Sequence, residues 1–599
     1  MERLAKFLTL ILLIVGVCVF IWGSDKSFDF TDEGLYLLVY QHPQEFPDSY
    51  TSYHRVGAVV SQMVGGNIIV LRLIGFFLTI FATFYFSISL ISFVKGRGIP
   101  LFENSSEQTL LHLALQGSVF SAYCWLPPTP NYNTMAGIGM LVSCGGILSF
   151  FASRNPRHSL GQAFAGVLAM GSGLLLAFLA KGSSAVGIVV ISFLLLGMCG
   201  LVTGREKVIF VAVASIAVLA GGVCIFFIIP GLFVSWEFLL GSIVALTEGN
   251  GAREIIVRHW QESMDFAMRH FRSFLLPIIL ALGVGYYSRS RAFEKFRDRK
   301  NAILVWLVAG VLVSEVILLI VRDVFSAGIQ GRAKSFIGYT SLFLVILTLR
   351  LGIHGLKKSI SPVQISGFLV FLLWLAVLPF VTAAGTTHKI FINALLHAAP
   401  ISAAILFMAS SLDKDLRKSV AVPFASVLLV GMGFSQFIYG FLVTPYRTAP
   451  KWVQTVPVEV GIPATVLKLD PDSAECIENT RAALNGAGFK PGDDILALYG
   501  LPGLVYAVGG VSPQRPWFFY DHGPDGDVAN LQALKKIPTD RLKSAYILWT
   551  DNDTRAAFQL SSCGVRIEDE FVQLGEAGIF FKNRSVKIMK PTFQKKREM

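Results

Sequence analysis

Long uninterrupted runs of apolar residues are the feature that most constrains how this 599-residue chain can fold. A helix needs roughly 20 apolar residues to cross the hydrocarbon core of a bilayer, and about thirteen stretches of that kind recur along the sequence. They lie at residues 6–23, 68–94, 107–126, 134–153, 160–180, 184–203, 208–229, 272–287, 302–321, 336–350, 363–383, 399–412 and 420–444. With 53% hydrophobic and only 15% charged residues, the chain has too little charge to cover a soluble surface of this size. The sequence therefore predicts a polytopic α-helical membrane protein with about thirteen transmembrane helices.

Short basic loops alternate with the apolar runs and set the expected orientation. Loops rich in Lys and Arg face the cytoplasm in membrane proteins, and one set of alternate loops is consistently basic. These loops read VKGRG, SRNPRHS, GREK, SRSRAFEKFRDRK, RLGIHGLKKS and LDKDLRKS. The pattern predicts a cytoplasmic N-terminus, and an odd number of spans then places the C-terminal part outside the cytoplasm. The net charge of +12 belongs to this loop pattern, so we expect membrane lipids and no nucleic acid as partners.

The composition changes after Pro445, where polar and apolar residues begin to mix. Strand-like runs such as DILALYG, SAYILWT and AGIFFKN accompany a helix-like run, SAECIENTRAALNGAG. We therefore expect a transmembrane domain over residues 1–444 and an exoplasmic α/β domain over residues 445–599. Cys476 and Cys563 lie in this second domain, where an oxidising compartment favours a disulfide and the geometry of the pair decides whether it forms.

Two adjacent acids follow the first apolar run, in the stretch FDFTDEGLYLLVY at residues 28–40. Thr31 or Asp32 can cap a helix whose apolar face begins at Leu35. An amphipathic helix lying on the membrane would hold Asp32 and Glu33 in its first turn at headgroup depth. A solvated loop acid is the alternative interpretation of this pair.

These features resemble the first outer loop of the GT-C glycosyltransferases, such as the protein O-mannosyltransferases and the lipid A aminoarabinose transferase. Further along, NIIVLRLIGFFLTI resembles the LRLPSAL opening of the family's second helix, with Arg72 at the matching Arg. The stretch FLAKGSSAVGIVV resembles the family's TKGP turn, with Lys181 at the Lys. The motif likeness covers the first 190 residues. The expected helix number and exoplasmic C-terminal domain also match the layout of the aminoarabinose-transferase type.

The resemblance implies an inverting transfer of a sugar from a polyprenyl-phosphate donor on the outer face of the membrane. The acceptor would be a cell-envelope glycan such as lipopolysaccharide, a lipid or a protein. This displacement needs a carboxylate to accept the acceptor's proton and cations to stabilise the departing phosphate. The resemblance makes Asp32 the base and Glu33 the neighbour that binds or orients the sugar. The expected location is a bacterial inner membrane with the site facing the periplasm, although an endoplasmic-reticulum protein would share this topology.

Several cations on the expected outer side are candidates for binding the phosphate. Lys181 is the first of them through its resemblance to the TKGP turn, and a snorkelling lysine is the alternative. For Arg72, a structural salt bridge with Asp32 or Glu33 is favoured over contact with substrate. Binding of lipid headgroups is the alternative for the remaining cations. These are Arg55, and Arg332 and Lys334 in the stretch SAGIQGRAKS. His388 and Lys389 in GTTHKIFINALLHAAP are further candidates for a headgroup or phosphate contact, with a plain interfacial loop as the alternative.

The second outer loop, WLPPTPNYNTMAG, lacks the acid that members of the resembled family often carry there. Asn131, Tyr132 and Asn133 are polar alternatives that can hydrogen-bond a sugar, and a rigid Pro-rich turn is the other interpretation. This departure leaves the acceptor and the metal dependence open. No metal site and no certain cofactor are predicted, with a divalent cation as an open option. The sequence has no Walker A loop, which argues against an energised pump.

Two other functions stay open beside glycosyl transfer. A ligase or polymerase of lipid-linked oligosaccharides also has about a dozen helices, but it favours a large outer loop between late helices. A transporter or flippase would carry ionisable residues or broken helices at mid-bilayer and a paired repeat. Here the acids cluster outside the apolar runs, and no repeat is evident.

Overall fold

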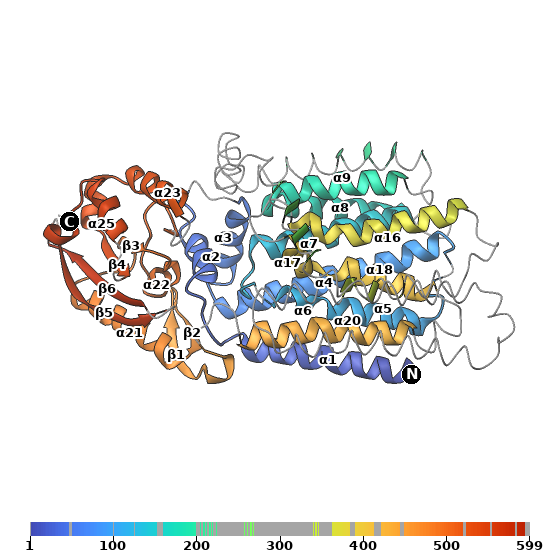
Figure 1. Cartoon of the computed structure of the whole chain (residues 1–599), viewed down its shortest axis with the longest axis horizontal. Helices are drawn as coiled ribbons and strands as arrows, with labels where there is room; N and C mark the ends of the chain where they lie inside the picture. The colour runs from blue at the N-terminus through green and yellow to red at the C-terminus, as the bar shows by residue number, and fades with distance from the viewer. Residues whose placement is uncertain are drawn as a thin grey trace.

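The chain forms a bundle of long helices and a region of strands and shorter helices, arranged end to end (Figure 1). The structure is a computed structural model, and it describes most of both parts. The described residues are 2–46, 51–99, 101–124, 126–152, 160–198, 362–383, 390–411, 421–443, 449–518, 523–550, 554–580 and 584–592, with scattered positions between 204 and 346.

Five helices in the described part of the chain are long and apolar enough to cross a membrane. They comprise α1 (Glu2–Gly23), α4 (Ile68–Gly96), α7 (Tyr132–Ala152), α8 (Leu160–Ala180), and α20 (Val422–Phe437) continued by the π-helical η3 (Ile438–Val443). The other helices in the described part of the bundle are α5 (Ser105–Gly117), α6 (Val119–Ala122), α9 (Gly182–Met198), α16 (Pro362–Ala383), α17 (Ile390–Ala394), η1 (Leu395–His397) and α18 (Ala399–Ser410). The bundle is therefore mainly helical and membrane-compatible in composition, as the apolar runs predict.

Most of the apolar runs that fall on described residues form the expected helices. The run at 107–126 differs, because it is divided into α5 and α6 at Ser118, whose hydroxyl donates to Leu115 O at 2.6 Å. Gly117 stands beside the break, where an added Cβ would lie 2.7 Å from the Val430 side chain, so α20 packs closely there. The runs at 208–229, 272–287, 302–321 and 336–350 lie largely outside the described residues.

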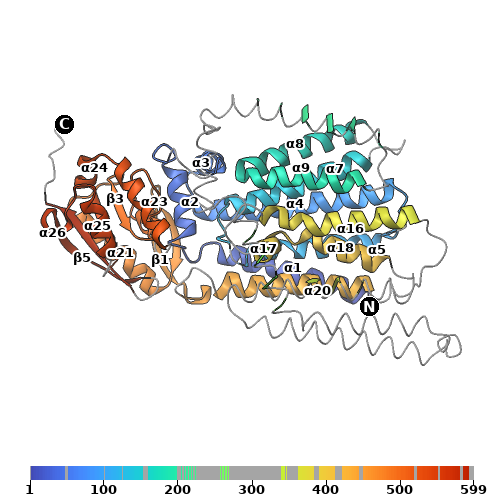
Figure 2. The same cartoon turned by 45° about the horizontal axis from the view of Figure 1, so that its top comes forward.

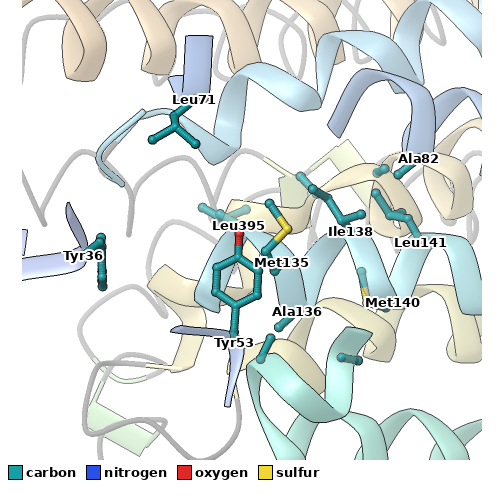
Figure 3. Close-up of a cluster of buried hydrophobic side chains, with 14 of the residues drawn as sticks. Tyr36, Tyr53, Leu71, Ala82, Met135, Ala136, Ile138, Met140, Leu141 and Leu395 are labelled. Carbon is teal, nitrogen blue, oxygen red and sulfur yellow. The ribbon is translucent and has the colours of Figure 1, made fainter. Parts of the chain in front are cut away.

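Small residues let α7 and α8 pack backbone to backbone. A Cβ on Gly146 would lie 2.4 Å from Met170 N, and one on Gly139 would lie 2.6 Å from Gly173 O. Such close approach supplies the van der Waals contact that holds helices together in lipid. Figure 3 draws part of the buried core, including Tyr36, Tyr53, Leu395 and side chains of α7.

The two helices α2 (Asp32–Gln41) and α3 (Tyr53–Met63) lie where the bundle meets the strand region (Figures 1 and 2). We call this end of the bundle the domain end. The helix α2 begins at the predicted position, but it is not a surface helix with one apolar face. Residues 33–40 are all buried, because the strand region covers the side that would otherwise face solvent.

The strand region contains a hairpin and a four-stranded sheet. In the hairpin, β1 (Val456–Val460) pairs antiparallel with β2 (Thr465–Leu469). The sheet has the order β3-β4-β6-β5, in which only β3 and β4 are parallel. Its strands are β3 (Ile495–Leu498), β4 (Tyr546–Thr550), β5 (Phe571–Phe580) and β6 (Arg584–Pro591). The helices and one short turn of this region are η4 (Lys451–Val453), α21 (Pro471–Gly486), α22 (Pro502–Ala507), α23 (Gly523–Lys536), α24 (Thr539–Ser544), α25 (Thr554–Ser561) and α26 (Ile567–Glu570).

The sheet buries both of its faces, because successive side chains of a strand point to opposite sides. Ile495 and Ala497 of β3 belong to the large core shared with α21, whereas Leu496 and Leu498 belong to a second core beneath α23–α26. Cys476 lies in the first core and Cys563 packs against the second, and both are free thiols. The disulfide considered from the sequence is therefore absent, since the sheet separates the two cysteines.

This arrangement makes a prediction about thiol chemistry. Adding a reducing agent should leave the melting temperature of the purified protein unchanged, and iodoacetamide should modify half-buried Cys563 before buried Cys476. Burial raises the pKa of both thiols, which keeps the reaction slow at neutral pH. Mass spectrometry of the alkylated peptides checks the order. A disulfide-linked pair of the two cysteine peptides, two hydrogen atoms lighter than their sum, would contradict the assignment of free thiols.

Polar contacts join the strand region to the domain end of the bundle. The Lys451 ammonium is fully buried and donates to Gly23 O at 2.6 Å and Lys26 O at 2.9 Å, so it caps the end of α1 and holds the segment that follows it. Gln41 Nε2 donates to Ile462 O at 2.6 Å, and Ile68 N donates to Thr465 Oγ1 at 3.2 Å. The strand region is therefore attached to α1, α2 and α4 together.

Candidate functional site

A buried ion pair fixes the start of α2 against α4. Arg72 binds Glu33 in a bidentate manner, with Nη2 2.6 Å from Oε2 and Nε 2.8 Å from Oε1, and both side chains are essentially inaccessible. The Thr129 hydroxyl donates to Glu33 Oε1 as well. Burial acts to raise the pKa of the Glu33 carboxyl, but the charge of Arg72 and the hydrogen bonds of Arg72 and Thr129 outweigh it and lower the pKa.

The remaining donors of Arg72 hold the chain that follows α1. Nη1 donates to Ser24 O at 2.7 Å, and Nη2 donates to Ser27 O at 2.9 Å. Buried charges are tolerated when they are paired and their hydrogen-bonding groups are used, as they are here. The salt bridge expected for Arg72 is thus present with Glu33. Both carboxylate oxygens of Glu33 are engaged by Arg72, which fixes α2 against α4.

Asp29 is a buried acid that sequence reasoning missed. Its Oδ1 accepts from Thr31 N at 2.8 Å and Thr31 Oγ1 at 2.6 Å, and its Oδ2 accepts from Glu33 N at 3.1 Å. In return, Asp29 N donates to Glu33 Oε2 at 3.3 Å, an exchange like that of a capping box. Burial raises the pKa of the Asp29 carboxyl to about 6 despite these hydrogen bonds. Asp29 therefore anchors the first turn of α2, and the pattern Asp-x-Thr was its one sequence signal.

Asp32 occupies the first turn of α2 and is half-buried, unlike its two acidic neighbours. Its carboxylate lies within electrostatic range of the hydroxyl of Tyr132, the first residue of α7. Tyr36 of α2 packs edge-on against the Tyr132 ring, with 6.2 Å between the ring centroids. Asp32 therefore faces the beginning of α7, while Glu33 turns inward to α4.

Lys181 approaches the same tyrosine from the junction of α8 and α9. Its ammonium lies 5.5 Å from the centroid of the Tyr132 ring and donates to Thr382 O of α16 at 3.0 Å. Burial lowers the pKa of this ammonium to about 7. An ammonium has three donors, and Lys181 uses one of them in hydrogen bonds to the part of the chain that the structure describes. The acid and the lysine predicted from the sequence thus share Tyr132 as a neighbour.

The position of Lys181 depends on contacts from the other side of the site. The Thr51 hydroxyl, just before α3, lies 2.9 Å from Leu179 O and 2.8 Å from Ala180 O and donates to these last carbonyls of α8. The Tyr40 hydroxyl of α2 donates to Pro130 O at 2.6 Å and so fixes the loop that leads into Tyr132. The first and second loops at the domain end are therefore joined.

His397 is a second residue that the sequence did not single out. Its Nε2 is 3.1 Å from Asn133 O, and its ring fills the space over Gly137, where a Cβ would lie 1.9 Å from the imidazole. Burial and, to a lesser degree, the charge of Lys181 together lower the pKa of His397 to about 3, so the ring is neutral. His397 lies in an apolar stretch of the sequence, NALLHAAP, which does not indicate that the histidine belongs to this site.

The other predicted site residues divide into three groups. Asn131 is buried and acts as a helix cap, because its Oδ1 accepts from Asn133 N and Thr134 N at the start of α7. That use of the side-chain oxygen argues against the predicted sugar contact of Asn131. Arg55 is half-buried on α3, and Asn133 is half-buried beside His397. Arg332, Lys334, His388 and Lys389 lie outside the described residues.

Metal binding has no evident place in the described part of the chain, where no group of three His, Cys, Asp or Glu side chains could hold an ion. The site that the structure does bring together consists of one half-buried carboxylate, one lysine, one tyrosine and one neutral histidine. It can accept a proton at Asp32 and bind an anion at Lys181.

Comparison with known proteins gives one distant likeness. No model of a known protein family matches the chain, and no curated protein matches it. Among solved structures, the crystal structure of ArnT from Cupriavidus metallidurans in the apo state is similar over 97% of each chain, with 12% identity and a TM-score of 0.38. A likeness of this degree decides neither the fold in detail nor the activity. The function therefore has to be inferred from the side chains at the domain end.

Proposed function

We propose that this chain is an integral-membrane glycosyltransferase that takes a sugar from a polyprenyl-phosphate donor. The observation that supports it is the approach of Asp32 and Lys181 to the same residue, Tyr132, at the domain end of an apolar bundle. At the domain end, a carboxylate can accept the proton of the acceptor and an ammonium can bind the phosphate of the donor. The phosphate of a lipid-linked donor reaches this end of the bundle from the bilayer.

In the proposed reaction, the acceptor hydroxyl oxygen attacks the anomeric carbon from the face opposite the phosphate. The bond between that carbon and the phosphate oxygen breaks, and the hydroxyl proton passes to the Asp32 carboxylate. The electron pair of the broken bond leaves with polyprenyl phosphate, whose added charge is stabilised by the Lys181 ammonium. The configuration at the anomeric carbon is inverted, and Tyr132 and His397 shape the space between base and phosphate.

The proposal includes the organisation of the whole chain. Residues 1–444 form the catalytic transmembrane domain, and residues 445–599 form an exoplasmic α/β domain. The domain end faces the periplasm of a bacterial inner membrane, and the acceptor is an envelope glycan, a lipid or a protein. The basic loops that predict a cytoplasmic N-terminus support this orientation.

The test uses purified protein in nanodiscs with a radiolabelled polyprenyl-phosphate sugar, and it follows both transfer of label and release of polyprenyl phosphate. Lys181→Gln should weaken donor binding, whereas Lys181→Arg should restore much of it because the cation is kept. A ligase of lipid-linked oligosaccharides would transfer only whole glycans. A flippase would move the lipid without releasing polyprenyl phosphate, and that result would overturn the proposal.

The pH dependence of donor binding follows from the same lysine. The phosphate binds the ammonium form, and the pKa of Lys181 is lowered to about 7 in the free protein. The dissociation constant for the donor should therefore rise by about tenfold per pH unit above this pKa and stay flat below it. Titration of the wild type and Lys181→Arg from pH 6 to pH 9 checks this. A slope that persists in Lys181→Arg would assign the effect to another group.

A further inference from the structure

The short helix α22 contacts the turn that carries Asp32 at unusually close range. Gly503 N donates to Phe30 O at 2.8 Å. A Cβ on Gly34 would lie 2.1 Å from Gly503 Cα, and a Cβ on Gly503 would lie 2.4 Å from Phe30 Cα. Non-bonded carbon atoms pack at about 3.5 Å or more. Both positions therefore need glycine, and α22 touches the backbone on each side of Asp32.

A tyrosine on the same helix, Tyr506, lies near Glu33 of the buried ion pair. The ring of Tyr506 stacks on Phe28 with 6.2 Å between centroids, and its hydroxyl lies within electrostatic range of Glu33. Tyr506 is buried, and its ring also occupies the space beside Gly461 of the β1–β2 hairpin, where a Cβ would lie 2.6 Å away. This side chain thus links the hairpin, α22 and the segment before α2.

We propose that α22 is a positioning element of the catalytic site, with Gly503 and Tyr506 as the residues that set the place of Asp32. The inference rests on the proposed function, which gives Asp32 its role as base. On the bundle side, Asp29, Glu33 and Arg72 fix the first turn of α2. On the opposite side, α22 fixes the same turn, so the strand region is a working part of the site.

The experiment introduces a methyl group into this contact through Gly503→Ala and, separately, Gly34→Ala. Displacement of the reacting groups by about 1 Å costs about 100-fold in rate, so kcat should fall by about that factor. The KM for the donor should stay within about twofold, because Lys181 lies between α8 and α9 and is held by Thr382 O of α16, not by α22. Gly486→Ala is the matched control, since nothing lies within 4 Å of a Cβ at that exposed end of α21. Folded Gly503→Ala protein with wild-type kcat, or an equal loss in Gly486→Ala, would overturn the inference.

Two further measurements decide the matter if a glycine variant does not fold. Tyr506→Phe keeps the ring on Phe28 and should retain kcat, whereas Tyr506→Ala should lower it without changing the donor KM. Wild-type kcat in Tyr506→Ala would contradict the proposed role.

Amide hydrogen exchange provides a readout that needs no turnover. In Tyr506→Ala, residues 28–41 should exchange faster than in the wild type while α1 is unchanged, whatever reaction the site performs. Unchanged exchange would overturn the positioning role. If exchange is faster but the wild-type chain transfers no sugar, the positioning role of α22 stands and the proposed function is wrong.

Discussion

Replacing Asp32 by Asn should lower sugar transfer by about 10²- to 10⁴-fold while leaving the protein folded, because a positioned general base contributes about that much to rate. The amide keeps the size of the side chain and cannot accept the proton of the acceptor. Since Lys181 is untouched, the KM for the polyprenyl-phosphate donor should change little. Steady-state assays with the donor varied at saturating acceptor give kcat and KM separately.

The control for Asp32 is Asp472→Asn, because Asp472 is also an aspartate in the first turn of a helix, α21, and is exposed. It shares the helix-terminal position with Asp32 but lies in the strand region. Its replacement should leave kcat unchanged. Retained turnover in Asp32→Asn, at an unaltered melting temperature, would remove Asp32 from the mechanism.

Of the proposed substitutions, one that breaks the ion pair between Glu33 and Arg72 should lower the free energy of unfolding the most. Glu33→Gln leaves the Arg72 guanidinium buried without its counter-charge, at a cost of about 3–5 kcal/mol. The matched control is Glu478→Gln, which breaks the exposed pair with Arg481, also 2.6 Å long, and should cost about 1 kcal/mol at most. Chemical denaturation of the detergent-solubilised variants measures both.

The double variant Glu33→Gln with Arg72→Met tests whether the two side chains act as a pair. The loss should be smaller than the sum of the two single losses, since no unpaired charge remains buried. The carbonyls of Ser24 and Ser27 still lose their donor, so recovery should be incomplete. Additive losses would show that Glu33 and Arg72 stabilise the fold independently.

The stretch at residues 28–40 shows what the sequence could predict about this site. The acids and the apolar spacing placed the start of a helix at Thr31 or Asp32, and α2 begins there. An arginine inside an apolar run required a nearby acid, and Glu33 is that partner. Both predictions were accessible because each depends on local capping or on the high cost of an unpaired charge in the membrane.

Other parts of the site depend on contacts between distant segments and could not be predicted. His397 owes its place to Gly137, and Thr51 to the last carbonyls of α8. The surface position expected for α2 was wrong because α22 covers this helix. The local sequence pattern of α2 carries no information about a helix that lies several hundred residues later in the chain. The apolar runs predicted most described helices of the bundle, since bilayer thickness sets their length.

The Lys451 ammonium that caps α1 joins residues 428 positions apart in the chain. At the usual speed of a ribosome, roughly 20 to 90 seconds separate the synthesis of these two partners. During that interval the first helix is already in the membrane, but α22, which covers the neighbouring helix α2, has not yet been synthesised. The buried contacts that hold the end of α1 must then be completed late in biogenesis, only after residue 451 has been synthesised.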